Sequence, residues 1–292
     1  MMPMAPILLT GGTGQVGQAV LRHAEERGLD IVAPNREQMD LTNARSIADM
    51  VASRRWSAVI NCAAYTAVDR AETDAELAEQ VNAVAPAVLG AETAKQDIPI
   101  IHVSTDYVFD GTNGAPYNED DAVNPLGVYG RTKEMGESAV RTLNPRHAII
   151  RTAWVVSAGG ANFINTMIRL ASERPEVSVV DDQIGCPSSA LDIAETLLVV
   201  AEHLPEQCGT WHFVNSGYAS WYDLAARIFA NMDQRGHPTP ILKATSSSQY
   251  PTPAKRPGNS RLSTLAIQRD FGIKPRHWHD AIDAILAERF KV

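Results

Sequence analysis

The chain has 292 residues, 45% of them hydrophobic and 21% charged, which is close to the average of globular proteins and excludes a disordered, collagen-like or coiled-coil chain. Its 26 Lys and Arg against 34 Asp and Glu give a formal net charge of −8, which disfavours nucleic acid and membrane surfaces as partners. Three widely spaced cysteines predict neither disulfides nor a zinc site, and no apolar stretch approaches the ~20 residues that cross a bilayer. Because the N-terminus also lacks the features of a signal peptide, we expect a cytoplasmic protein.

Strands and helices alternate along the first half of the chain. A short apolar run ends in a glycine-rich turn and is followed by apolar residues at helical spacing, and the same order then repeats. The predicted strands are Ile7–Thr10, Asp30–Ala33, Ala58–Asn61, Ile98–Val103 and His147–Arg151, and the predicted helices are Gln15–Gly28, Asn43–Arg54, Leu77–Ala94 and Gly127–Arg141. Strands joined by helices indicate a parallel sheet, so we expect a doubly wound α/β domain over residues 1–153.

This alternation loosens after Arg151. The predicted elements there are the helices Asn162–Ser172, Leu191–Ala201 and Trp221–Asn231 and the strands Val177–Val180 and Trp211–Val214. Residues 239–260 are crowded with Pro, Ser and Thr, so we expect no regular structure there, but either a plain surface loop or an ordered loop that carries binding groups beside a cleft. We therefore expect a smaller, mixed α/β domain over residues 154–292, from which some segments within 180–215 can return to the first domain.

The first strand leads into three glycines, Gly11, Gly14 and Gly17, spaced G-x-x-G-x-x-G before a helix. Glycines allow a tight turn and bring backbone N–H groups against a pyrophosphate at the positive end of the helix. A glycine-rich turn can also be purely structural, but its place between the first strand and a helix favours a dinucleotide. The candidate contacts in this turn are Gly11, Thr13, Gly14, Gln15, Val16 and Gly17.

The residues after the second strand bear on which dinucleotide binds. An acid there holds the ribose 2′-hydroxyl of NAD, whereas an arginine accommodates the 2′-phosphate of NADP. Beside the candidate contact Asn35, Arg36 favours NADP, Glu37 keeps NAD possible, and a solvated surface arginine would look the same, so we expect NADPH or NADH. The further candidate contacts are Asp40 and Leu41 at the adenine and Ala63, Ala64 and Tyr65 after the third strand.

A tyrosine and a lysine stand four residues apart in the predicted helix Gly127–Arg141. This spacing brings Tyr129 and Lys133 onto one face, where the ammonium is expected to lower the pKa of the phenol and make it a general acid. An ordinary amphipathic surface helix would show the same pattern. The pair, however, follows the end of a buried strand at Thr105, where ligands meet an open sheet. We therefore predict Thr105, Tyr129 and Lys133 as catalytic residues, the last two also as cofactor contacts.

These motifs, in this order, resemble those of the extended short-chain dehydrogenase/reductase family. The resemblance rests on TGGTGQVG, NCAA, STD and YGRTK. Longer stretches, among them NCAAYTAVDRAE, STDYVFDG, NPLGVYGRTKEMGE, RTAWVVSAGGANF, DDQIGCPSSA and YPTPAKRPGNSRL, resemble the members that reduce a dTDP-linked 4-keto sugar, and they run from residue 10 to about residue 262. The resemblance implies a Rossmann-type sheet with a smaller substrate-binding domain. It also implies NAD(P)H-dependent reduction of the C4 ketone of dTDP-4-dehydro-L-rhamnose to dTDP-L-rhamnose.

The resemblance further implies individual roles. In the family, the tyrosine that matches Tyr129 protonates the developing alkoxide, the lysine that matches Lys133 tunes it and holds the nicotinamide ribose, and the residue that matches Thr105 steadies the oxygen. The nucleotide sugar is expected to lie among Thr66, Asp106, Tyr107 and Trp154, although an aromatic residue beside a strand end is often part of the core. A guanidinium binds phosphate oxygens bidentately, so Arg256 is predicted to contact the diphosphate of the sugar nucleotide rather than to be a solvated surface side chain.

The sequence departs from the family at one possible metal site. Some members dimerise through a magnesium ion held by glutamates, and the corresponding positions here are Ala19 and Leu191. His277 and His279 lack a third ligand. We therefore expect no metal, and a monomer or weak homodimer that is not bridged by a metal ion.

Two other functions remain open from the sequence. Sugar-nucleotide epimerases and dehydratases share the fold and the Tyr–Lys pair, but Tyr107 stands where a dehydratase has its second acid, a glutamate. Relatives of such reductases also serve as regulatory partners of methionine adenosyltransferase, so a non-catalytic dinucleotide-binding subunit is the second alternative.

Overall fold

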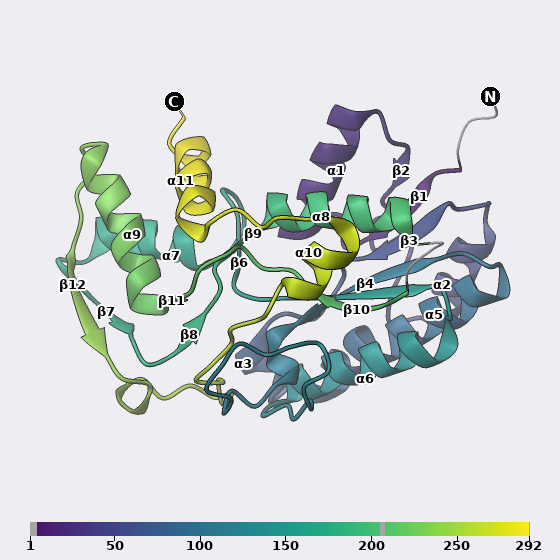
Figure 1. Cartoon of the computed structure of the whole chain (residues 1–292), viewed down its shortest axis with the longest axis horizontal. Helices are drawn as coiled ribbons and strands as arrows, with labels where there is room; N and C mark the ends of the chain where they lie inside the picture. Colours follow the sequence, from purple (N-terminus) through teal and green to yellow (C-terminus); the bar gives the residue numbers. More distant parts are fainter. Residues whose placement is uncertain (1–4, 205–207, 292) are drawn as a thin grey trace.

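Six parallel strands form the central sheet, in the order β10-β5-β4-β3-β1-β2 (Figure 1). The structure, a computed structural model, describes residues 5–204 and 208–291. The strands are β1 (Ile7–Thr10), β2 (Ile31–Val32), β3 (Ala58–Asn61), β4 (Ile100–Thr105), β5 (His147–Thr152) and β10 (Gly209–His212). The chain order reverses between β1 and β3, where β1 pairs with β2 on one side and with β3 on the other. The prediction of a doubly wound parallel α/β sheet is confirmed.

Helices cover both faces of this sheet, α1 and α8 above it and α5 and α6 below it in Figure 1. The helices around the sheet are α1 (Gln15–Arg27), α2 (Ala44–Ala52), α3 (Val68–Ala71), α4 (Ala75–Glu79), α5 (Ala85–Lys95), α6 (Val128–Leu143) and α8 (Ala190–His203). Successive strand residues point to opposite faces, so Leu9, Ile60 and Ile101 pack against α1 and α8, whereas their neighbours Leu8 and Val59 pack against α2 and α5. Two buried faces explain why the strands are continuous apolar runs.

The second half of the chain builds three two-stranded sheets beside three helices, α7 (Phe163–Glu173), α9 (Trp221–Gln234) and α11 (Trp278–Arg289). The sheets pair β7 (Glu176–Val180) with β12 (Ile241–Thr245), β8 (Ile184–Gly185) with β11 (Ala219–Ser220), and β6 (Val155–Val156) with β9 (Ser188–Ser189). Buried residues such as Ile164, Leu224 and Ile282 join the three helices into a second apolar core. In contrast, α8 and β10 lie on the central sheet.

The structure corrects several predicted elements. Residues 239–260 were expected to lack regular structure but contain strand β12 and the short 3-10 helix η3 (Ser247–Gln249). Strand β12 forms because it pairs with β7, and this distant pairing cannot be predicted from the local sequence. The sequence analysis also missed α3, α10 (Leu265–Phe271) and α11. Within the described ranges, no helix combines the length and the apolar composition needed to cross a membrane.

The predicted helix Leu77–Ala94 is interrupted by a π-helical turn, η1 (Gln80–Val84). This turn carries the buried Asn82, whose amide pairs with both backbone groups of Tyr65: Oδ1 accepts from its N–H at 2.8 Å and Nδ2 donates to its carbonyl at 3.1 Å. Nδ2 also donates to Oγ1 of Thr132 at 3.1 Å. Asn82 therefore ties the loop after β3 to helix α6.

Candidate active site

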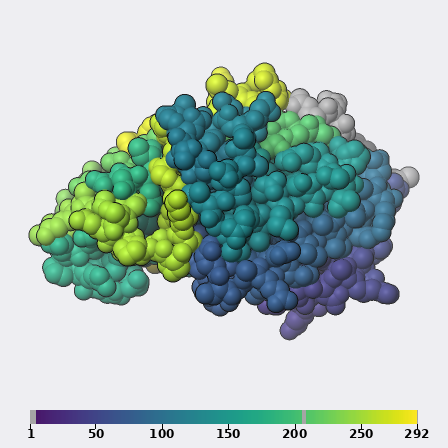
Figure 2. All heavy atoms as spheres, turned by 90° about the horizontal axis from the view of Figure 1, so that it is seen from below, coloured from purple at the N-terminus to yellow at the C-terminus, as the bar shows by residue number. Residues whose placement is uncertain are grey.

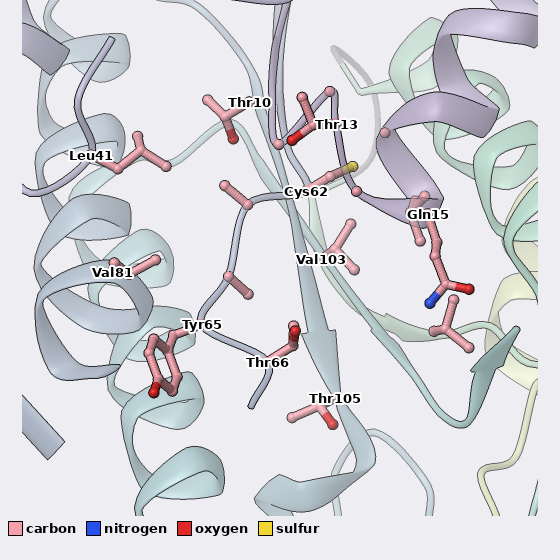
Figure 3. Close-up of a pocket in the computed structure, with 18 of the residues that line it drawn as sticks. Thr10, Thr13, Gln15, Leu41, Cys62, Tyr65, Thr66, Val81, Val103 and Thr105 are labelled. Carbon is pink, nitrogen blue, oxygen red and sulfur yellow. The ribbon is translucent and has the colours of Figure 1, made fainter. Parts of the chain in front are cut away.

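A cleft of about 950 Å³ opens where β1, β3, β4 and β5 end at the carboxyl edge of the sheet. It lies at the point where the strand order reverses, which is where ligands bind in open α/β sheets. Figure 3 shows Thr10, Cys62 and Thr105 projecting from these strand ends, with Gln15 at the start of α1 on one side and Leu41 and Val81 on the other.

The glycine turn forms one wall of the cleft, packed closely against the end of β3. Gly11 has φ +73°, and a Cβ there would lie 2.6 Å from the backbone nitrogen of Ala63. A Cβ at Gly17 would overlap the carbonyl oxygen of Gly11. Helix α1 begins at Gln15, and its N-cap residue, Gly14, has no side chain to occupy the space before the helix. This geometry leaves the positive end of α1 accessible to an anionic group such as a pyrophosphate.

The structure brings all predicted cofactor contacts to this one cleft. They are Gly11, Thr13, Gly14, Gln15, Val16, Gly17, Asn35, Arg36, Asp40, Leu41, Ala63, Ala64, Tyr65, Tyr129 and Lys133. Arg36 is exposed at the rim, beside Asp40. Hydrogen bonds from the backbone and side chain of Thr42 hold the pKa of Asp40 below its usual value, so Asp40 is an acceptor at neutral pH.

Tyr129 lies in the first turn of α6 and lines the same cleft as the glycine turn. The start of this helix is fixed from outside it, because the N–H of Val128 donates to Glu72 at 2.8 Å. The rings of Tyr129 and Tyr107 meet edge to face with their centroids 5.4 Å apart. Thr105, at the end of β4, hydrogen-bonds the Tyr129 side chain and thereby lowers its pKa.

The expected lowering of the Tyr129 pKa by Lys133 is wrong for this structure. Burial raises the pKa of Tyr129 to about 12 and outweighs the hydrogen bond from Thr105. Lys133 directs its ammonium elsewhere, since Nζ donates to the carbonyl of Val103 at 2.7 Å and lies 3.3 Å from Nε2 of His102. Sequence spacing placed the two residues on one helix face but could not show how deeply each is buried.

Lys133 is itself almost fully buried, with 1% of its surface exposed. Burial lowers its pKa to about 8, and the carboxylate of Glu137, one turn further along α6, opposes this lowering. Glu137 is shared with Arg151, whose guanidinium donates three hydrogen bonds to it, at 3.0, 3.2 and 2.7 Å. The ammonium therefore sits in a buried region whose nearest carboxylate is already paired.

Five of the six predicted substrate contacts also line the cleft: Thr66, Thr105, Asp106, Tyr107 and Trp154. Asp106 accepts a hydrogen bond from Thr105 at 2.9 Å, and burial raises its pKa to about 6. The indole of Trp154 stacks on that of Trp221 with centroids 3.5 Å apart, and its backbone adopts φ +45°. Trp154 thus belongs both to the cleft wall and to the second core.

Arg256, the sixth predicted contact, does not line the cleft. Its guanidinium pairs bidentately with Asp69 at 2.9 and 2.8 Å, and the same carboxylate accepts from the backbone of Ala254 at 3.1 Å. Arg256 still lies close enough to Tyr107 to lower the pKa of that phenol. Figure 2 shows the segment around residue 256 lying along the first half of the chain, at the seam between the two halves.

The sequence analysis missed several polar contacts near the cleft. Gln15 accepts hydrogen bonds from Ser157 at 2.6 Å and from Asn162 at 2.9 Å, and so joins the glycine turn to the second half. Thr10, Asn61 and His102 form a buried chain of polar contacts that ends at Lys133. The available signal was a histidine and an asparagine inside otherwise apolar strands, where polar groups need partners.

Comparison with known proteins agrees with this geometry. The family model described as RmlD substrate binding domain matches residues 4–290. A dTDP-4-dehydrorhamnose reductase of Salmonella typhimurium is 40% identical over 97% of this chain and 98% of that protein. Among solved structures, a dTDP-4-dehydrorhamnose reductase from Clostridium acetobutylicum aligns with a TM-score of 0.92 at 35% identity, covering 97% of this chain and 99% of that one. Another from Bacillus anthracis, in complex with NADP, aligns with a TM-score of 0.92 at 29% identity over 98% and 99%. The resemblance seen in the sequence is confirmed, and the chain belongs to the RmlD substrate binding domain family.

Proposed function

We propose that this protein reduces the C4 ketone of dTDP-4-dehydro-L-rhamnose to dTDP-L-rhamnose with NADPH or NADH. The observation that carries the proposal is that Thr105, Tyr129 and Lys133 line the same cleft as the glycine turn. The relatives named dTDP-4-dehydrorhamnose reductase cover nearly the whole chain, and one was solved with NADP. The similarity to these relatives therefore extends over both halves of the chain.

The cleft fits a dinucleotide in both size and chemistry. The glycine turn and the start of α1 would hold the pyrophosphate, Asn35, Arg36 and Asp40 the adenosine side, and Lys133 the nicotinamide ribose. When bound, the reduced nicotinamide supplies a hydride to a carbonyl carbon. Gly11 packs tightly on Ala63 and has no side chain to occupy the cleft at this point.

The protein's own contribution is a proton and an electrostatic environment. With its pKa at about 12, Tyr129 keeps its proton at neutral pH, and because a phenol is a stronger acid than a sugar alcohol, transfer to the alkoxide at C4 is favourable. Thr105 stabilises the resulting phenolate by its hydrogen bond. Proton transfer of this kind contributes about 10² to 10⁴ in rate.

The sugar nucleotide is proposed to lie between the two halves. Thr66, Asp106, Tyr107 and Trp154 would surround the sugar, and Arg256, oriented by Asp69, would meet the diphosphate from the seam. We propose that residues 1–153 together with α8 and β10 form the dinucleotide-binding part and that the remaining segments of 154–292 form the substrate-binding part.

The test is stoichiometric oxidation of NADPH or NADH, followed by loss of the nicotinamide absorbance, when dTDP-4-dehydro-L-rhamnose is added. Tyr129→Phe removes the proton donor and should lower turnover by about 10² to 10⁴ while cofactor binding persists. Tyr222→Phe, in the second core outside the cleft, is the matched control and should leave turnover unchanged. Product formation without net oxidation would instead indicate an epimerase or dehydratase, and cofactor binding with no turnover would indicate a regulatory subunit.

A further inference from the structure

Four buried polar side chains from different elements form one chain of contacts at the cleft. The hydroxyl of Thr10, on β1, donates to Oδ1 of Asn61, on β3, at 2.5 Å. Nδ2 of Asn61 lies 2.9 Å from Nδ1 of His102, on β4, and Nε2 of His102 lies 3.3 Å from Nζ of Lys133, on α6. None of the four is more than 2% exposed. Only Lys133 has a role in the proposed reaction, so the other three require an explanation.

The first two contacts fix the protonation of the histidine. Because Oδ1 of Asn61 accepts the Thr10 hydroxyl, the amide turns Nδ2 towards His102, and an amide nitrogen can only donate. Nδ1 of His102 must therefore be the acceptor and carry no proton. His102 is fully buried, and its pKa is lowered well below the usual value, so the ring is neutral and its single proton lies on Nε2.

This tautomer directs an N–H group at Lys133. An ammonium has only donors, so Nε2–H and a charged Nζ would face each other as two donors, whereas a neutral amine can accept the ring proton. The carbonyl of Val103 accepts an N–H from Nζ in either state. The other titratable or charged groups near Nζ are Cys62, which directly follows β3, Glu137 on α6 and, behind Glu137, Arg151 on β5.

We propose that His102, held as its Nε2–H tautomer by Asn61 and Thr10, is a positioning residue that favours the neutral amine of Lys133 over its ammonium. The consequence, which rests on the proposed function, is that the histidine helps to set the pH at which Lys133 loses the charge that it carries in the cleft. Removing the Nε2–H donor should then let Lys133 keep its proton to higher pH.

The tautomer is tested directly, without any substrate. In the full-length protein labelled with nitrogen-15 at histidine, two-bond proton–nitrogen correlations distinguish a protonated Nε2 from a protonated Nδ1. The signals that disappear in His102→Phe belong to His102. A protonated Nε2 with a bare Nδ1 supports the proposal. A protonated Nδ1 means that the amide of Asn61 is turned the other way, and this result would overturn it whether or not the protein is a reductase.

The consequence for Lys133 is tested by the pH dependence of kcat. His102→Phe keeps a ring of similar shape, and the alkaline limb should move to higher pH by about half a unit to one unit, the size expected for loss of one hydrogen bond. Thr10→Val frees the Asn61 amide to turn and should move the limb in the same direction by less. It also keeps the proposal testable if His102→Phe does not fold.

The matched control is His147→Phe, which removes another buried histidine, at the amino end of β5 and outside the cleft. It should lower stability without moving the alkaline limb. An unshifted limb in folded His102→Phe would mean that the histidine serves packing alone, and a limb moved to lower pH would mean that it stabilises the ammonium. Either result refutes the proposal.

Discussion

A single methyl group at Gly130 tests how closely the catalytic wall must be held. Gly130 lies between Tyr129 and Lys133 in the first turn of α6, with ordinary helical backbone. A Cβ there would overlap the carbonyl oxygen of Tyr107 and lie 2.9 Å from Cβ of Pro125. Both neighbours belong to backbone or to a proline ring, so neither can swing aside. In Gly130→Ala, the start of α6 must therefore move away from the loop that carries Tyr107.

The size of this movement sets the expected loss. The new Cβ falls about 1 Å inside the closest approach that such atoms make, and a misplacement of about 1 Å at a catalytic group costs on the order of 10² in rate. Glycine to alanine inside a helix normally gains about 0.5–1 kcal/mol, but overpacking costs about 1–3 kcal/mol. Gly130→Ala should thus lose about 10²-fold in kcat with only a modest loss of stability.

The assay is steady-state kcat with saturating NADPH, together with urea unfolding of each variant. Gly90→Ala is the matched control, because it places the same methyl group in the neighbouring helix α5, where the nearest atom, Cβ of Leu143, lies at an ordinary 3.5 Å. It should gain slightly in stability and keep its turnover. If Gly130→Ala turned over as fast as the parent, close packing of α6 against the loop that carries Tyr107 would not be needed for catalysis.

Three further outcomes are expected. Asp69→Asn should raise KM for the sugar nucleotide more than KM for NADPH, because the carboxylate orients Arg256; equal effects on both constants would contradict this. Asp106 has a pKa raised from 3.8 to about 6, so the stability of the protein should fall as pH rises through that interval. Asp106→Asn should flatten the dependence of the melting temperature on pH, and a dependence that persists in the variant would have to come from other groups. Gln15→Ala should weaken binding of both ligands in calorimetry, because Gln15 joins the glycine turn to Ser157; sugar-nucleotide binding equal to that of the parent would exclude this link.

The parts of the molecule that could be predicted are those governed by local pattern. Apolar strands between helices indicate a parallel sheet, and the glycine turn and the Tyr129–Lys133 spacing each lie within a few residues, so their positions follow from the sequence. Strand β12 was not predictable, because it depends on pairing with β7, more than sixty residues earlier in the chain. Its own residues are mostly exposed, and their apolar and polar side chains do not alternate clearly enough to predict a strand.

Burial and pairing between distant residues account for what the sequence could not predict in the site. The pKa of Tyr129 depends on how many elements close around its ring, and periodicity in one helix contains no information on that. The sequence shows only the charge of Arg256, and its ion pair with Asp69, 187 residues away, appears only in the folded chain; its contact with the diphosphate stays a prediction. Polar partners of this kind become visible only once the two halves are packed together.

The π-helical turn at residues 80–84 has a consequence for engineering this protein. It holds one residue more than a regular helix would, and this extra residue directs the Asn82 amide towards Tyr65 in the loop after β3. Deleting one residue to make the helix regular would rotate the helix on one side of the deletion by roughly 100° relative to the other side. A chimaera that takes this helix from a donor without the extra residue should therefore carry a loosened loop after β3, even if every residue on the cleft surface is retained.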